Sequence, residues 1–105
     1  MYYKTLKAST VCLCGSARFR DKFIEVAKEL TLQGYNVIVP LLFVKDDIDS
    51  LEQIERDYFN EIHLAKIANA DLIYVINCQG YIGETTRSEI NWAVSLGKKI
   101  KYLED

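Results

Sequence analysis

Two hydrophobic patterns alternate along the chain. Four short apolar runs have the length and β-branched content of strands, and they cover residues 9–14, 36–40, 70–77 and 98–104. The stretches between them carry apolar residues at spacings of three and four, which is the pattern of one helix face. The fourth run alternates apolar and polar residues, as is typical of a strand at the edge of a sheet.

Local signals bound the three predicted helices. The first is expected to end at Gly34, because glycine suits the left-handed backbone that follows many helices. Ser50 is a candidate N-cap for the second helix. The third is expected over 88–97, with its end at Gly97. The second helix has one apolar stripe, made of Leu51, Ile54, Tyr58, Ile62 and Ala65.

This order of elements predicts an α/β fold. Strands that alternate with helices form a parallel sheet with helices on both faces, in three layers. Right-handed crossovers give the four strands the order 2-1-3-4. The direction of winding then reverses between the first and third strands, and ligands bind at the carboxyl ends of such strands. Those ends are residues 14–16 and 77–83.

Size and composition restrict the class of protein. A chain of 105 residues, half of them hydrophobic and 27% charged, fits one globular domain spanning 1–105. The net charge of −2 offers no basic surface to a nucleic-acid polymer. No apolar run has the length of a membrane span, and the polar N-terminal residues do not resemble a signal peptide. We therefore expect a cytoplasmic protein.

The three cysteines do not have the spacing of a metal site. Cys12 and Cys14 point to the same face of one predicted strand, and Cys78 follows another strand. Zinc sites usually pair CxxC motifs with further cysteines or histidines. We expect reduced, buried, structural thiols and no bound metal.

The loop after the first strand is the first candidate ligand contact. Gly15 lets a ligand approach the backbone, and Ser16 offers a hydroxyl. Free N–H groups at the start of the next helix favour an anion, and Arg18 adds a positive charge. The alternative is an ordinary strand-to-helix turn in which Ser16 caps the helix.

The segment 80–89 is the second candidate. Thr86-x-x-Glu89 matches a capping box, in which Glu89 only ties down the start of a helix. Alternatively, Glu89 lies in the first turn of that helix, where the dipole keeps it ionised, and acts as a nucleophile or base. The remaining candidate contacts to a sugar, phosphate or base are Gly80, Tyr81, Gly83, Glu84, Thr85 and Thr86.

His63 is the only histidine, and it shares a helix face with Lys66. Its place late in the second helix puts it toward the amino end of the third strand, away from the expected site. A lone histidine on a helix is more often structural than catalytic.

Several of these segments together resemble the nucleoside 2-deoxyribosyltransferase-like superfamily, which includes deoxynucleoside 5'-monophosphate N-glycosidases. The segments are VCLCGSARFR, HLAKIANADLIYVIN, SEINWAVSLGKKI and KYLE. The resemblance implies a flavodoxin-like or Rossmann-like sheet and makes Glu89 the nucleophile that attacks the anomeric carbon. It also implies that Gly15, Ser16 and Arg18 hold the phosphate end of a substrate.

The chain also departs from the family pattern. The transferases carry an aspartate where His63 aligns, so the alignment would bring His63 into the pocket as an acid for the leaving base. They carry a second acidic residue where this chain has Gly83 beside Glu84. In family members, residues from a C-terminal extension or a neighbouring subunit complete the pocket.

Two functions follow as hypotheses. The first is a nucleoside or nucleotide N-glycosidase or 2-deoxyribosyltransferase that needs no cofactor. The second is a non-catalytic module of the same fold that binds or senses a nucleotide. We also expect a homo-oligomer, because Trp92 and Tyr102 are candidate exposed aromatics beside short sheet edges.

Overall fold

The structure, a computed structural model, describes residues 9–41 and 51–104. In chain order its elements are β1 (Thr10–Gly15), η2 (Ala17–Phe19), α1 (Arg20–Leu32), β2 (Asn36–Ile38), α3 (Gln53–Ala68), β3 (Leu72–Ile76), η3 (Cys78–Gly80), α4 (Glu84–Ser95) and β4 (Lys99–Tyr102). None of these helices combines the length and apolar character that crossing a membrane requires.

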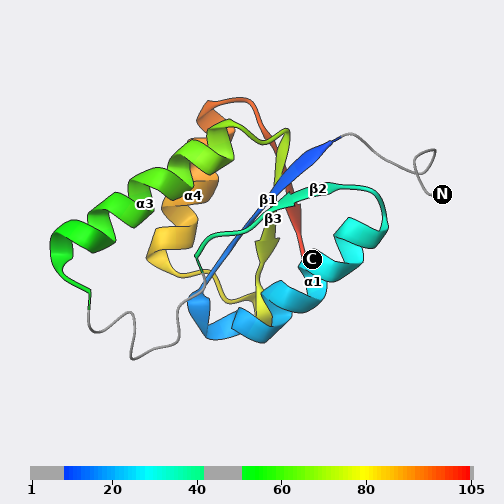
Figure 1. Cartoon of the computed structure of the whole chain (residues 1–105), viewed down its shortest axis with the longest axis horizontal. Coiled ribbons are helices and arrows are strands. Elements are labelled where there is room, and N and C mark those ends of the chain that lie inside the picture. The colour runs from blue at the N-terminus through cyan, green and yellow to red at the C-terminus, as the bar shows by residue number, and fades with distance from the viewer. Residues whose placement is uncertain (1–8, 42–50, 105) are drawn as a thin grey trace.

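All four strands run parallel in one sheet with the order β2-β1-β3-β4, which confirms the predicted order. β1 and β3 are neighbours, and Gly15 at the end of β1 lies opposite Ile76 at the end of β3. The loops that follow these two strands therefore emerge side by side at one edge of the sheet (Figure 1).

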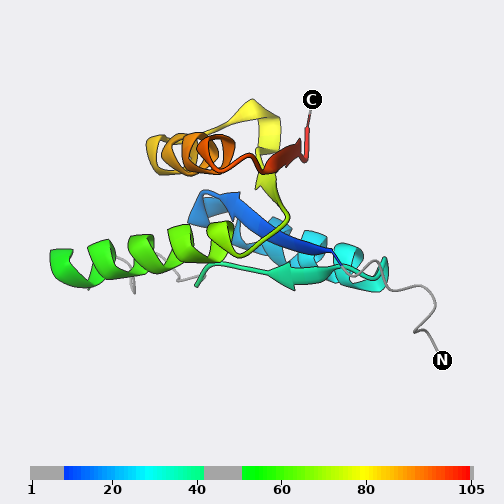
Figure 2. The ribbon, with the colours of Figure 1, turned by 90° about the horizontal axis from the view of Figure 1, so that it is seen from above.

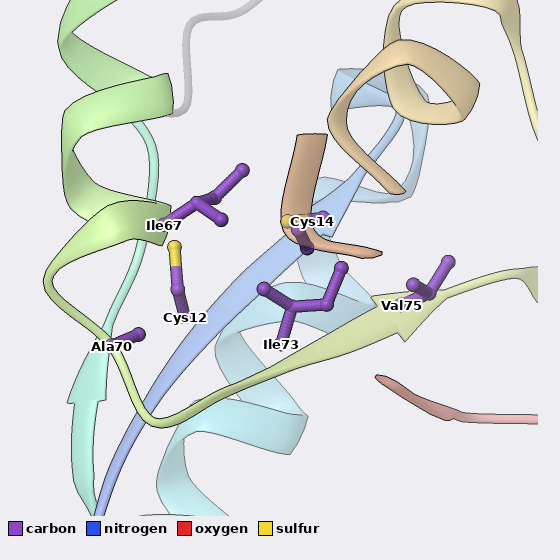
Figure 3. Packing of buried hydrophobic residues seen from close by; sticks show 7 residues of the cluster. Cys12, Cys14, Ile67, Ala70, Ile73 and Val75 are labelled. Carbon is purple, nitrogen blue, oxygen red and sulfur yellow. The ribbon is translucent and has the colours of Figure 1, made fainter. Parts of the chain in front are cut away.

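Helices cover both faces of the sheet, as predicted. On one face, Cys12 and Cys14 of β1 pack in a cluster with Ile67 of α3 and Ala93 of α4. Figure 3 shows both cysteine side chains rising from β1 on the side where Ile67 lies. On the other face, Leu13 packs with Phe23 and other side chains of α1. This alternation follows from the strand geometry, which points successive side chains to opposite faces.

The start of α3 differs from the prediction. Its N-cap is Glu52, whose backbone N–H donates to the Glu55 carboxylate at 3.0 Å, and Ser50 lies outside the described residues. The first half of α3 extends beyond the strands in both views (Figures 1 and 2). Ile54 and Tyr58 of the predicted apolar stripe are consequently 74% and 60% exposed. Ile62 is 40% exposed and Ala65 is also exposed, so the predicted stripe does not face the core, and α3 buries His63 and Ile67 instead.

The ends of two helices match the prediction. α1 ends at Leu32, and Gly34 follows with a φ of 99°. α4 ends at Ser95, and Gly97 follows with a φ of 74°. Both glycines adopt the left-handed backbone that residues with a Cβ rarely take.

Two hydrogen bonds fix α3 against its surroundings. The indole N–H of Trp92 in α4 donates to the Leu64 carbonyl at 3.0 Å. The Lys66 ammonium donates to the Val39 carbonyl, just after β2, at 3.1 Å. α3 is thereby attached to both neighbours, and this sets which of its side chains face the ends of the strands.

Candidate active site

A cavity of about 790 Å³ lies where β1 and β3 end. Gly15 and Ser16 line it from the loop after β1, and Tyr81 lines it from the loop after β3. The start of α4 adds residues 83–86 and Glu89, and α3 adds His63. Most of the residues singled out in the sequence therefore lie around one cavity at the switch point of the sheet.

α4 begins four residues earlier than predicted. It starts at Glu84, with Gly83 as N-cap, so Thr86 is its third residue and Glu89 its sixth. The capping-box interpretation of Thr86 and Glu89 is therefore wrong, because a capping box needs its first residue outside the helix. Glu89 also lies in the second turn, where the helix dipole acts only weakly. The electrostatic environment of Glu89 is therefore set mainly by the side chains around it.

Those neighbours are His63 and the core. The side chains of His63 and Glu89 are 8% and 10% exposed, and His63 Nε2 lies 3.6 Å from Glu89 Oε1. Burial lowers the pKa of His63, but the hydrogen bond and negative charge of Glu89 outweigh it, so the net shift is upward. The raised pKa widens the pH range in which the His63 imidazole is protonated.

The position of His63 corrects the expectation drawn from its place in the helix. His63 lines the cavity at the ends of β1 and β3, whereas its place late in the helix predicted a position away from it. The alignment with the superfamily anticipated this. His63 Nδ1 is buried and has no hydrogen-bond partner among the described residues. One ring nitrogen is thus without a partner in the part of the chain that the structure describes.

Cys14 lies beneath this pair. Its Sγ is 3.6 Å from His63 Nε2, and the side chain is fully buried. Its hydrogen bond with Cys12, together with burial, raises the pKa of the Cys14 thiol. A thiol that stays protonated is a poor nucleophile, which leaves Glu89 as the candidate nucleophile at this wall.

The loop after β1 is built around Gly15. A Cβ at this position would lie 2.9 Å from the Ile76 carbonyl oxygen and 3.2 Å from Phe23 Cζ. Ser16 Oγ accepts a hydrogen bond from the Arg18 N–H at 3.3 Å, so it caps a turn as in the simpler interpretation. That turn is the short 3-10 helix η2, and α1 starts only at Arg20. The first free N–H groups after β1 therefore belong to η2, which leads directly into α1.

Arg18 and Gly80 do not line the cavity. The Arg18 guanidinium carbon lies 4.1 Å from the centre of the Tyr81 ring, a cation–π contact that holds Tyr81 from outside. Gly80 has a φ of 78° and allows the turn that leads to Tyr81. A Cβ at Gly83 would lie 3.2 Å from the Tyr81 hydroxyl. All three residues thus shape the position of Tyr81.

Arg56 and Phe59 line the cavity from α3, although the sequence did not single them out. Together with His63 and Lys66 they are spaced by three, four and three residues. That spacing places all four on one helix face. This spacing can be read from the sequence, but the prediction followed the apolar stripe on a neighbouring face of the same helix.

Similarity to known proteins extends to the fold of this chain but assigns it to no family. No protein-family model matches it, and no curated protein matches it. Among solved structures it is similar to the CMP N-glycosidase BcmB of Clostridium botulinum, with a TM-score of 0.58 and 18% sequence identity. The match covers 89% of this chain and 69% of that chain. The likeness extends over the parallel α/β fold as a whole.

Proposed function

We propose that this protein cleaves the N-glycosidic bond of a nucleotide or nucleoside, with Glu89 as the nucleophile. The observation that carries the proposal is a nearly buried carboxylate in a cavity wall, 3.6 Å from a histidine and across from the Gly15–Ser16 loop. The similarity to a CMP N-glycosidase supports the same class of reaction.

In the proposed reaction, a Glu89 oxygen attacks the anomeric carbon as its bond to the base nitrogen breaks. The leaving base takes a proton from protonated His63, and the raised pKa of His63 widens the pH range in which it carries that proton. The product is a sugar ester of Glu89. Neutral His63 then accepts a proton from water, and the resulting hydroxide attacks the anomeric carbon. This breaks the ester bond, releases the free sugar and restores Glu89. Transfer would use a second base in place of water.

The remaining side chains would orient the substrate. The backbone around Gly15 and the Ser16 hydroxyl would bind the phosphate or sugar, with the exposed Thr85 hydroxyl as a further donor. Tyr81 would cover the base, with Arg18 holding the ring from behind. Buried Thr86 would support the wall rather than bind the substrate.

The test is release of free base from CMP, deoxyCMP and a panel of deoxynucleosides and their monophosphates, followed by chromatography. We expect Glu89→Gln to lower kcat by at least about 1,000-fold, as loss of a covalent nucleophile does. Glu84→Gln is the matched control, since Glu84 lines the same cavity from the same helix but is exposed. It should change the rate by less than about tenfold, the scale of one exposed binding contact. Equal rates for Glu89→Gln and wild type would exclude Glu89 as the nucleophile.

The same experiment addresses the binding-module hypothesis. A module that only senses nucleotides would bind CMP or a relative saturably and release no base. The buried pair of Glu89 and His63 favours the enzyme, because placing an ionisable pair out of water has a desolvation cost that simple binding does not require.

We also propose a homo-oligomer. Trp92 and Tyr102 are 38% and 41% exposed. Aromatic residues are enriched at protein interfaces. Light scattering across a range of protein concentrations would give the mass, and a monomer at all concentrations would contradict the proposal.

A further inference from the structure

Two cysteines and the histidine meet in the core beneath the cavity. One ligand atom from each of Cys12, Cys14 and His63 lies within 4.8 Å of the other two. All three side chains are buried. The proposed glycosidase chemistry uses His63 but neither thiol. Figure 3 shows the two cysteines on the same side of β1.

The separation between Cys14 and His63 matches that of neighbouring ligand atoms around a bound zinc ion. In a tetrahedral site with Zn–S of about 2.3 Å and Zn–N of about 2.0 Å, neighbouring ligand atoms lie about 3.3–3.8 Å apart. Cys14 Sγ and His63 Nε2 are 3.6 Å apart. His63 Nε2 and Glu89 Oε1 are also 3.6 Å apart. Glu89 therefore lies next to the fourth position of such a site.

The charge of the ligands and the access from the cavity also suit a bound divalent cation. Two thiolates neutralise a divalent cation, so the ion does not add net charge to the core. Lys66 lines the same cavity as Glu89 and adds a positive charge there. The ion can enter from the cavity, because His63 and Glu89 both line it. Sulfur and imidazole ligands select thiophilic metals such as zinc over magnesium or calcium.

We propose that Cys12, Cys14 and His63 bind one thiophilic divalent cation, such as Zn²⁺, with Glu89 at or beside the fourth coordination position. On binding, each thiol S–H bond is replaced by a sulfur–metal bond, and the two protons pass to the solvent. The sequence did not suggest this site, because His63 is 49 residues from Cys14 and no CxxC motif is present.

The site has a consequence for activity that rests on the proposed function. A cation held by His63 and next to Glu89 occupies the proposed acid and shields the proposed nucleophile. Metal binding and base release should therefore exclude each other, and Zn²⁺ should act as an inhibitor at the active site.

The test is a Co²⁺ titration of the chelator-stripped, reduced protein, because Co²⁺ reports its ligands by absorption. Tetrahedral thiolate ligation gives intense visible bands and a sulfur-to-cobalt charge-transfer band in the near ultraviolet. We expect both bands, saturation at one metal per chain and release of at least two protons per metal. Zn²⁺ should displace Co²⁺ and abolish the bands.

Three cysteine variants locate the site. Cys12→Ser and Cys14→Ser should weaken Co²⁺ binding by at least about 100-fold, because losing even an outer-shell partner costs about 10–100-fold. Cys78→Ser is the matched control, since Cys78 packs against the α1 cluster on the opposite face, and it should bind as wild type. Circular dichroism of each variant checks that it is folded. Wild-type protein without the charge-transfer band, or Cys12→Ser binding as tightly as wild type, overturns the proposal.

A separate measurement connects the site to activity. Zn²⁺ should inhibit base release by wild type but not by Cys12→Ser, which lacks one proposed ligand. Cys12 does not line the cavity, so this substitution should leave base release without Zn²⁺ unchanged. If no substrate is turned over, the proposed function fails while the Co²⁺ titration still decides the metal site. If base release is unaffected by Zn²⁺ in a protein that shows the cobalt bands, Glu89 is not blocked, and exclusion between metal and substrate is wrong.

Discussion

The Gly15→Ala substitution tests how tightly β1 and β3 approach at the floor of the cavity. A Cβ at Gly15 would lie 2.9 Å from the Ile76 carbonyl oxygen and 3.1 Å from Ile76 Cβ. Ile76 is the residue paired with Gly15 across the sheet, so relief requires the two strands to separate. The φ of 155° at Gly15 is also one that residues with a Cβ rarely adopt.

The magnitude follows from these two contributions. Overpacking a well-packed core costs about 1–3 kcal/mol. An unfavourable positive φ costs roughly 1–2 kcal/mol. We therefore expect Gly15→Ala to lose about 2–5 kcal/mol of unfolding free energy. For a domain of this size, each kcal/mol corresponds to about 4–8 °C in Tm.

Gly97→Ala is the matched control. Gly97 has a φ of 74°, and a Cβ there would meet no atom within 4 Å. It therefore carries the backbone cost alone, about 1–2 kcal/mol. Both substitutions remove the same freedom from the unfolded chain, so that effect cancels in their difference.

Thermal and urea unfolding of both variants measure this difference. Gly15→Ala should melt below Gly97→Ala by about 4–24 °C, which is the overpacking cost alone. It should also lower base release, because Ser16 moves with β1. If the two variants have the same Tm, the close approach of β1 to β3 at Gly15 is not real, and the geometry of the cavity floor is wrong.

Two further predictions concern the buried polar groups. The folded pKa of His63 is raised above its ordinary value of 6.5, so in chelator-treated protein its contribution to stability is complete below pH 6.5 and is lost as pH rises through the folded pKa. Glu89→Gln should remove that loss, since burial alone lowers the pKa; urea unfolding at several pH values gives the comparison. Asn77, which is 6% exposed, exchanges two hydrogen bonds of 2.9 Å with the Glu104 backbone. Asn77→Ala should lower the unfolding free energy by roughly 1–3 kcal/mol in the same assay. An unchanged free energy of unfolding would mean that these hydrogen bonds do not hold the backbone at Glu104 against the end of β3.

The sequence by itself determined the order of the elements and the topology of the sheet. Short β-branched runs separated by helical patterns allow few arrangements once crossovers must be right-handed. The same strand order puts Ser16 and Tyr81 at the carboxyl ends of neighbouring strands. These features depend on local pattern and handedness, which the sequence carries directly.

Only the tertiary structure decided where helices begin and which side chains meet. Thr86 and Glu89 carry a capping signal, yet α4 starts at Glu84, because a helix end is set by packing as well as by local preference. The contact of His63 with Glu89 and Cys14 depends on how α3 lies against β1 and α4. That crossing is fixed by side chains distant in the sequence, so no local pattern could state it.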